Sequence, residues 1–395
     1  MYKFTNFKGV DTDERFRFTG AMCVKLKPIP VDRPWRDATG GFGAYAPIGM
    51  WCELRDKSGY SSGGFVSASF ERNIIPAVLC GEDRSYDEWY EDLYWRLRNF
   101  GFQSGEIVDL AQLELMMLDI MAKRRGLPLH RLLGATKDYA LCYKGGGSLL
   151  ASDDELVGEM ATYAGQGYRT VKFKVGSDWG RDMEADARRL MKVREALGDE
   201  FEIAVDCNQV FDAGEAVEFW NMIKEFRPAW FEEPVHSHDM NAIAYVAQHT
   251  DAVVAAGESM RNAFAFETYV EKGVRHLMPL VGRMSRMSDL VRIRDMARKN
   301  HLRFSSGGNV WLNAAFGAAF YDEGEFLENH EPMTMPIGQC LSVKPEERNG
   351  RMYLSDIPGS PIRLDREGLE RRGLIDDIKF YGVDKAGGFY VRGTY

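Results

Sequence analysis

Acidic and basic side chains recur in the middle of this chain, each one directly after a short apolar run. Three carboxylates stand 26 residues apart, at Asp206, Glu232 and Glu258. Lys172 and Lys174 precede them in the run TVKFKV and leave the same face of a strand because they are two residues apart. Converging carboxylates repel one another unless a hard cation neutralises them, and Mg²⁺ leaves coordination positions open for substrate oxygens. The pattern therefore predicts a magnesium site with two lysines beside it.

The elements that position these residues are short apolar runs that alternate with helical patterns. Between about residues 139 and 308, seven strand-like runs alternate with six amphipathic helices. Such alternation is typical of parallel βα units, and one long series of them closes most simply into a (β/α) barrel. Catalytic groups of a barrel lie at the carboxyl ends of its strands. The lysine pair and the three carboxylates fall at such ends, so a barrel would bring them together.

The segments on either side of the barrel have a different pattern. The N-terminal part reads first as strands and then, over residues 67–126, as helices. We expect an α+β capping domain over residues 1–128, the barrel over residues 129–340, and a C-terminal segment, residues 341–395, that packs back on the capping domain. The glycine-rich loop at residues 33–48 is expected to be a lid over the active site.

The composition narrows the classes of partner. With 50 Lys and Arg against 59 Asp and Glu, the chain carries a net charge of −9. This charge argues against nucleic acid or an anionic membrane as the main partner, since both need a basic field. No apolar run approaches the roughly 18 residues of a membrane span, and no basic segment followed by an apolar one opens the chain. We expect a cytoplasmic protein that acts on a small molecule.

The motifs TVKFKVG, IAVDCNQ, WFEEP and AAGES resemble those of the enolase superfamily, specifically its mandelate racemase subgroup. The helical run QLELMMLDIMAKRRGLPLHRLLGA and the α+β capping domain extend the resemblance to nearly the whole chain. The resemblance implies an α/β fold, a (β/α)7β-type TIM-like barrel under an α+β capping domain. It also implies Mg²⁺ as the cofactor and a homo-oligomer as the assembly.

The resemblance assigns roles to the site residues. It implies that Asp206, Glu232 and Glu258 bind Mg²⁺, with Glu232 rather than its neighbour Glu233 pointing inward. It implies that Lys174 is the base and Lys172 its electrostatic partner. Because burial, the adjacent Lys172 ammonium and a nearby Mg²⁺ all disfavour a protonated amine, we expect the pKa of Lys174 to be lowered.

Further substrate contacts are expected around this centre. By resemblance, Asn208 lies near the metal and Glu328 binds the acid group of the substrate. Arg283 is too basic to act as a base and is assigned to an anion contact. His236 is a candidate contact for a sugar hydroxyl. None of the histidines outside the pair His236 and His238 is predicted to lie at the mouth of the barrel.

The chain departs from the family pattern at the second base. Members of this type usually carry an Asp after the sixth strand and a His after the seventh, and the two act on the opposite face of the substrate. Leu280 and Gly307 occupy those positions here. Tyr143 and Lys144, which end the first barrel strand, are candidates for the missing polar partner. A core role for Tyr143 is an equal alternative, because tyrosines are often buried for their apolar ring.

The missing dyad favours one reaction. Racemisation usually needs an acid on the face opposite the base, whereas β-elimination needs a single base and a proton for the departing hydroxyl. We therefore predict a Mg²⁺-dependent dehydratase of a polyhydroxy acid, an aldonate or aldarate, that yields a 2-keto-3-deoxy acid. A racemase, epimerase or cycloisomerase of the same superfamily is the alternative. A Schiff-base aldolase and a non-catalytic binding relative are further hypotheses.

Overall fold

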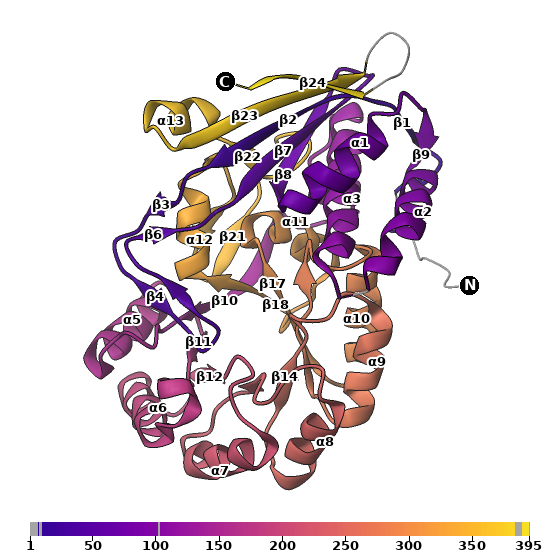
Figure 1. The fold of residues 1–395 in the computed structure, drawn as a ribbon. Coiled ribbons are helices and arrows are strands. Elements are labelled where there is room, and N and C mark those ends of the chain that lie inside the picture. The colour runs from indigo at the N-terminus through magenta and orange to yellow at the C-terminus, as the bar shows by residue number, and fades with distance from the viewer. Residues whose placement is uncertain (1–6, 8–9, 102, 384–388, 395) are drawn as a thin grey trace.

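The computed structural model describes residue 7 and residues 10–101, 103–383 and 389–394. A barrel and an antiparallel sheet with its own helices make up the two main parts of the molecule (Figure 1). Across these described ranges, none of the helices combines the length and the apolar character that crossing a membrane requires.

Eight parallel strands form the barrel. Each strand pairs with the next along the chain, and pairing between the last strand, β18, and the first, β10, closes the circle. This closed barrel confirms the predicted fold class. The strands are β10 (Tyr139–Gly146), β11 (Thr170–Lys174), β12 (Glu202–Asp206), β13 (Phe231–Glu232), β14 (Val254–Ala256), β15 (His276–Leu277), β17 (Arg303–Gly308) and β18 (Phe326–His330).

Helices surround the barrel on its outside (Figure 1). Side-chain caps begin several of them; Ser152 and Glu155, for example, form a capping box at the start of α5. The helices are α5 (Asp153–Gly165), α6 (Met183–Leu197), α7 (Ala213–Ile223), α8 (Met240–His249), α9 (Ala263–Lys272), α10 (Ser288–Lys299) and α11 (Val310–Phe320).

The last helix and strand of the barrel are absent from the alternating pattern read in the sequence. Helix α11 is buried along most of its length and has apolar residues on every side, so no helical period marks it. Strand β18 reads FLENH, and its last three residues are all polar although it belongs to the barrel wall.

The capping part is a five-stranded antiparallel sheet with helices packed on it (Figure 1). The C-terminal strands enter this sheet, because β23 pairs with β2. The hairpin β20–β21 instead joins β10 of the barrel, so the segment after residue 340 contacts both parts. The elements are β2 (Phe18–Leu26), β7 (Met50–Asp56), β8 (Ser61–Val66), β23 (Ile375–Val383), β24 (Phe389–Thr394), β20 (Glu346–Arg348), β21 (Arg351–Tyr353), α2 (Tyr86–Leu97) and α3 (Gly105–Arg124).

The predicted lid segment contains a small hairpin, β4 (Trp35–Arg36) and β5 (Gly41–Phe42), that reaches from the capping part to the barrel (Figure 1). A Cβ atom on Gly41 would overlap the carbonyl oxygen of Trp35, so the hairpin requires glycine there. The backbone N–H of Arg36 donates to Ser148 Oγ at 3.0 Å, and the N–H of Leu149 donates to the Arg36 carbonyl at 2.8 Å. These bonds dock the hairpin on the loop that follows β10.

Candidate active site

A cluster of buried charges lies at the carboxyl ends of β11, β12, β13 and β18. The Nζ atom of Lys172 is 2.8 Å from Glu232 Oε1, 2.8 Å from Glu328 Oε1 and 3.1 Å from Asp206 Oδ2. The Nζ atom of Lys174 is 2.6 Å from the same Asp206 oxygen. The structure therefore brings five of the sequence-predicted residues into one network.

Strand register explains why these residues meet. Lys174 pairs with Asp206 across β11 and β12, and Asp206 pairs with Glu232 across β12 and β13. Paired residues of parallel strands stand at the same height, and side chains two apart share a face. Three neighbouring strands thus present their last inward residue at one level of the barrel.

The backbone turns sharply just beyond these strand ends. Asn208, Gln209 and Glu233 have φ values of 45°, 67° and 38°, in the left-handed region that residues other than glycine rarely adopt. Such conformations cost about 1–3 kcal/mol each and concentrate at functional sites. The turn after β13 also separates the two consecutive glutamates described next.

Glu232 and Glu233 point to different surroundings. Glu232 faces the lysine cluster, and its second oxygen accepts a hydrogen bond from Trp230 Nε1 at 3.0 Å. Glu233 accepts hydrogen bonds from Gln209 Nε2 at 2.9 Å and from the hydroxyl of Ser237. The inward direction expected for Glu232 is therefore the direction that it takes.

The acids and amines shift one another's pKa values. Burial opposes ionisation of Asp206, but the adjacent Lys172 and Lys174 ammonium groups outweigh it and hold the pKa of Asp206 below its usual range. Burial and the nearby Asp206 charge raise the pKa of Glu232 well above its usual range. The same two causes raise the pKa of Glu258. Repulsion among the carboxylates is therefore an energetic feature of this site.

The arrangement raises the pKa of Lys174. Burial, the largest single cause, and Lys172 lower this pKa, as expected, but the carboxylates of Asp206, Glu258 and Glu328 together raise it by more. The amine is in direct contact with the ionised acid Asp206, so the net shift is upward. The lowering expected beside a bound Mg²⁺ stays a prediction.

The donor set suits a hard divalent cation by its chemistry. Asp206 is close enough to affect the ionisation of both Glu232 and Glu258, and Asn208 adds a buried amide oxygen that has no hydrogen-bond partner. In this structure Asp206 and Glu232 turn toward the lysine amines. No three acidic, histidine or cysteine side chains in the described ranges therefore have metal-site geometry. The three ligands stay a prediction that rests on their chemistry and their strand positions.

Tyr143 lies in the apolar layer beneath the lysines. Its ring meets Trp230 edge-on at 5.2 Å, and Lys172 Nζ stands 5.9 Å from the ring centre. The phenol is buried, its hydroxyl has no partner, and burial raises the pKa of Tyr143 well above its usual range. These surroundings favour the core interpretation, and a catalytic role for Tyr143 stays a prediction.

Lys144 is not part of the site, and its prediction as a substrate contact is corrected here. The side chain leaves the opposite face of β10, where its Nζ atom contacts Glu331 at 2.7 Å and Glu347 at 2.8 Å. Neighbouring residues of a strand point to opposite sides. Because Tyr143 faces the interior, Lys144 must face the surrounding elements.

Arg283 and His236 lie outside the lysine cluster. Both side chains are exposed, and the His236 ring meets that of His238 at 5.8 Å. Burial and, after it, the Arg283 charge lower the pKa of Arg261, whose Nη1 atom donates to the Glu258 carbonyl at 2.7 Å. Contacts of Arg283 and His236 with substrate stay predictions, and Arg261 is a cation of this region that the sequence analysis did not single out.

His330 is the site residue that the sequence analysis missed. It ends β18 two residues after Glu328, on the same face of the strand. After burial, the charges that shift its pKa include those of Lys174, Glu328 and Lys172. The expectation that no further histidine lies at the mouth is therefore wrong. The i, i+2 relation to Glu328 was the available signal, but the strand itself had not been recognised.

The positions of the missing dyad face each other as the family pattern implies. Leu280 pairs with Gly307 across β16 (Leu280–Val281) and β17. A Cβ atom on Gly307 would lie 2.5 Å from Leu280 Cδ2 and 3.2 Å from Glu328 Oε2. An apolar side chain thus stands where a second acid–base group would act.

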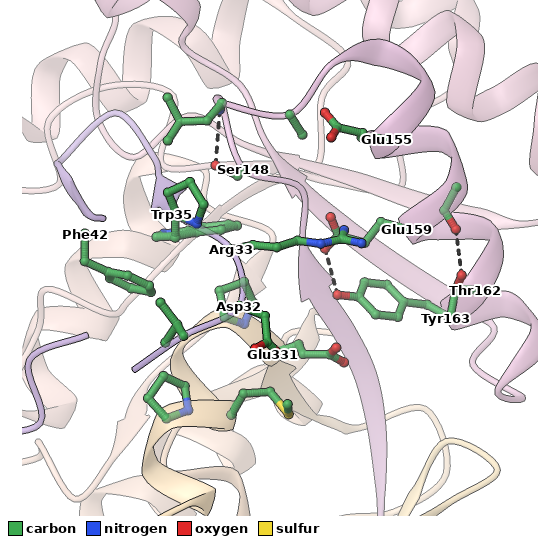
Figure 2. Close-up of a pocket in the computed structure, with 18 residues that line it drawn as sticks. Asp32, Arg33, Trp35, Phe42, Ser148, Glu155, Glu159, Thr162, Tyr163 and Glu331 are labelled. Carbon is green, nitrogen blue, oxygen red and sulfur yellow. Dashed lines mark hydrogen bonds between the residues drawn. The ribbon is translucent and has the colours of Figure 1, made fainter. Parts of the chain in front are cut away.

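A separate cavity of about 740 Å³ lies on the outer side of the lid hairpin. Figure 2 shows Arg33 and Trp35 of the lid segment facing Glu159 and Tyr163 of α5, with Glu331 of α12 (Glu331–Gly338) nearby. Trp35 lines this cavity and also meets the His330 ring edge-on at 4.9 Å. The indole therefore contacts both the cavity and a residue at the barrel mouth.

The family model for enolase C-terminal domain-like proteins matches residues 155–368, more than half of the chain. The chain belongs to this family. The match confirms the resemblance to the enolase superfamily drawn from the strand-end motifs. Within this superfamily, the cluster of lysines and acids lies at the carboxyl ends of the barrel strands, where barrel enzymes carry their active sites.

Several characterised proteins are similar to this enolase-superfamily chain. The L-talarate/galactarate dehydratase of Salmonella typhimurium LT2 is 27% identical over 359 residues, which cover 87% of this chain and 88% of that protein. The arabinonate dehydratase of Saccharolobus solfataricus is 25% identical and covers 81% of this chain and 85% of its own length.

Solved structures extend the comparison to the fold. The Salmonella L-talarate/galactarate dehydratase liganded with Mg and L-lyxarohydroxamate has a TM-score of 0.76 at 25% identity, over 96% of this chain and 98% of its own. A racemase from Streptomyces coelicolor with bound magnesium has a TM-score of 0.77 at 20% identity, over 91% and 100%. At that lower identity the racemase shows the shared fold alone.

Proposed function

We propose that the chain is a Mg²⁺-dependent dehydratase of a polyhydroxy acid, an aldonate or an aldarate. It would remove the proton next to the carboxylate, eliminate the 3-hydroxyl and release a 2-keto-3-deoxy acid. The observation that carries the proposal is the one-sided arrangement of the site. The lysine pair is complete on one side. On the other side, Leu280 stands beside Gly307 at the positions where a racemase would carry its second base.

The names of the relatives support the same reaction class. Dehydratases of talarate or galactarate and of arabinonate are similar to this chain along most of their length. A D-xylonate dehydratase from Haloferax volcanii is 25% identical over 80% of this chain. Because these proteins act on different sugar acids, the similarity supports the reaction more strongly than any one substrate.

Lys174 would carry the proton in this reaction. Its amine must be neutral to accept the Cα proton, so the 2.6 Å ion pair with Asp206 is the contact that has to be released first. Lys172 would remain an ammonium and face the negative charge that develops on the substrate carboxylate. Glu328, held by Lys172, would bind the same acid group and would have to carry a proton to donate to it.

Asp206, Glu232 and Glu258 would hold the cation. When bound, Mg²⁺ supplies fixed positive charge against the two oxygens of the deprotonated acid, which stabilises charge where it develops. After proton abstraction, the C3–O bond breaks and the hydroxide leaves as water with one proton. The resulting enol then tautomerises to the ketone.

The test is a panel of aldonates and aldarates incubated with the protein and Mg²⁺, with 2-keto products detected by semicarbazide. We expect product from at least one acid, no product after EDTA treatment, and no product with Lys174→Ala. If every acid stays inert with the wild-type protein, the proposal is wrong.

The same panel separates the alternatives. Exchange of the C2 proton with solvent deuterium without a keto product would indicate a racemase or epimerase. Borohydride trapping of a substrate on Lys174, with activity that survives EDTA, would indicate a Schiff-base aldolase. Calorimetry that shows no Mg²⁺ binding would favour a binding protein without catalysis.

A further inference from the structure

The imidazole of His330 has unused hydrogen-bonding capacity inside the site. Both ring nitrogens are buried, and neither has a hydrogen-bond partner. Buried polar atoms are nearly always paired, so two unpaired atoms on one ring need an explanation. The hydroxyl of Tyr143 is also unpaired, but it lies in the apolar layer below Lys172, whereas His330 ends its strand at the mouth.

The barrel wall directs this ring toward the reacting groups. Gly145 of β10 pairs with Lys172 on one side and with His330 on the other. A Cβ atom on Gly145 would lie 2.8 Å from Glu328 Oε1 and 3.1 Å from His330 Cδ2. Glycine therefore leaves open the space across which His330 and Glu328 approach the lysines.

The surroundings also set what the ring can bind. Burial and the Lys174 ammonium lower the pKa of His330 to about 4. At neutral pH the imidazole is uncharged, with one nitrogen that donates and one that accepts. A hydroxyl group, which both donates and accepts, complements this ring, whereas an acid group is already matched by Lys172 and the cation site.

Trp35 of the lid holds the ring in place. Its indole meets the imidazole edge-on at 4.9 Å, and the lid hairpin is docked by the bonds between Arg36 and the loop after β10. The ring is thus fixed on one side by the lid and on the other by its own strand. A substrate enclosed beneath the hairpin would contact the remaining edge of the imidazole.

We propose that His330 binds the 3-hydroxyl of the substrate, the group that leaves in the dehydration. This inference rests on the proposed function, and it assigns to β18 the hydroxyl contact that Leu280 and Gly307 cannot provide. His330 would hold the departing oxygen by a hydrogen bond and orient the C3–O bond for cleavage. The proton that Lys174 takes from Cα would pass to the departing oxygen, which leaves as water, so no net proton is required of the imidazole.

The experiment compares two processes in the same enzyme. With a sugar acid that the wild-type protein dehydrates, C2 exchange in deuterium oxide and keto-acid formation are measured for His330→Leu and His330→Gln. We expect His330→Leu to raise the ratio of exchange to dehydration at least tenfold, and His330→Gln, which keeps a donor and an acceptor, to restore part of the loss. An unchanged ratio in His330→Leu would overturn the proposal.

A binding measurement tests the contact between His330 and the 3-hydroxyl in a protein that does not turn the substrate over. Calorimetry with the substrate's 3-deoxy analogue and with the substrate itself, in a Lys174→Ala background, gives the affinity that the 3-hydroxyl contributes. We expect this contribution to disappear with His330→Leu, and equal contributions with and without His330 would contradict the inference. His249→Gln, on the exposed face of α8, is the matched control and should behave as the parent protein.

The two proposals fail in different ways. If the proposed function is wrong, the wild-type protein forms no keto acid from any member of the panel. If only the inference on His330 is wrong, the wild-type protein dehydrates its substrate and the variants lose exchange and elimination in equal measure. Thermal unfolding of each variant separates a misfolded protein from either result.

Discussion

Strands β10 and β18 carry charged or polar side chains on both faces, and the two faces differ in how these groups are matched. On the outer face, Lys144 contacts Glu331 and Glu347, and Glu347 also accepts from Tyr168 and Asn329. On the inner face, Lys172 alone is shared by three carboxylates. Polar atoms remain unpaired there, both nitrogens of His330 among them.

This difference separates structural charge from functional charge. In the outer cluster the one cation, Lys144, meets two acids that neutralise it, and both oxygens of Glu347 accept hydrogen bonds, although Asn329 Oδ1 has no partner. The inner cluster keeps acids in mutual repulsion and leaves hydrogen-bonding capacity for another molecule. Perturbed and unsatisfied groups of this kind are characteristic of binding and catalytic sites.

The largest expected effect comes from replacing a glutamate by glutamine on the inner face, compared with the same replacement on the outer face. Glu232→Gln should lower turnover on the order of 10²–10³-fold, because it removes a charge that the cation site needs. Glu347→Gln makes the same change on the outer face and should leave kcat within about twofold. Steady-state kinetics and calorimetric Mg²⁺ titration of both variants check this. Similar losses in the two variants would contradict the division between the faces.

A second change tests the outer face for stability. Lys144→Met leaves Glu331 and Glu347 without their cation and should lower the free energy of unfolding by roughly 2 kcal/mol. We expect less than the 3–5 kcal/mol of a fully buried pair, because the two acids are 34% and 35% exposed. Urea unfolding measures the loss. The double variant Lys144→Met, Glu347→Gln should recover part of it, with kcat unchanged in both.

Two consecutive glycines offer a sharper comparison. Gly145→Ala places a methyl group 2.8 Å from Glu328 Oε1 on the inner face and should lower kcat roughly 10–100-fold by displacing site residues. Gly146→Ala faces the other way, where the methyl group would overlap Glu159 and lie 2.9 Å from the Tyr163 hydroxyl. That variant should lose about 1–3 kcal/mol of stability and keep its kcat. Equal kinetic defects would show that the strand is not divided in this way.

The smallest expected effect concerns a buried acid outside both clusters. Asp109 of α3 accepts hydrogen bonds from Ser67 and Ser69, and burial raises its pKa to about 7. A folded pKa above the unfolded value stabilises the protein at low pH, and this stability is lost as pH rises through about 7. Asp109→Asn should therefore unfold at a higher temperature than wild type at pH 8.5, with a smaller difference at pH 5.5.

The control for Asp109 is the slope of the melting temperature against pH. Between pH 5.5 and 8.5 this slope should be flatter in Asp109→Asn than in the wild-type protein. Parallel slopes would mean that the carboxyl does not change its ionisation in this range.

The sequence by itself determined the barrel and the inner cluster. Parallel strands end at one rim, so the order Lys172, Lys174, Asp206, Glu232 along successive strands predicts that these residues lie together. The alternation of apolar runs with helices predicts the (β/α) barrel. Both inferences depend on local periodicity, which the sequence records directly.

Only the tertiary structure decided the groups whose roles depend on neighbours from distant segments. His330 was missed because β18 has a weak strand pattern and α11 before it has no helical period. Lys144 was misplaced because the face of β10 is fixed by pairing with β18 and β21. The pKa of Lys174 is raised because the carboxylates that packing brings to it, Asp206 foremost, together outweigh burial. Packing of distant segments sets which charges touch, and no local pattern in the chain records those contacts.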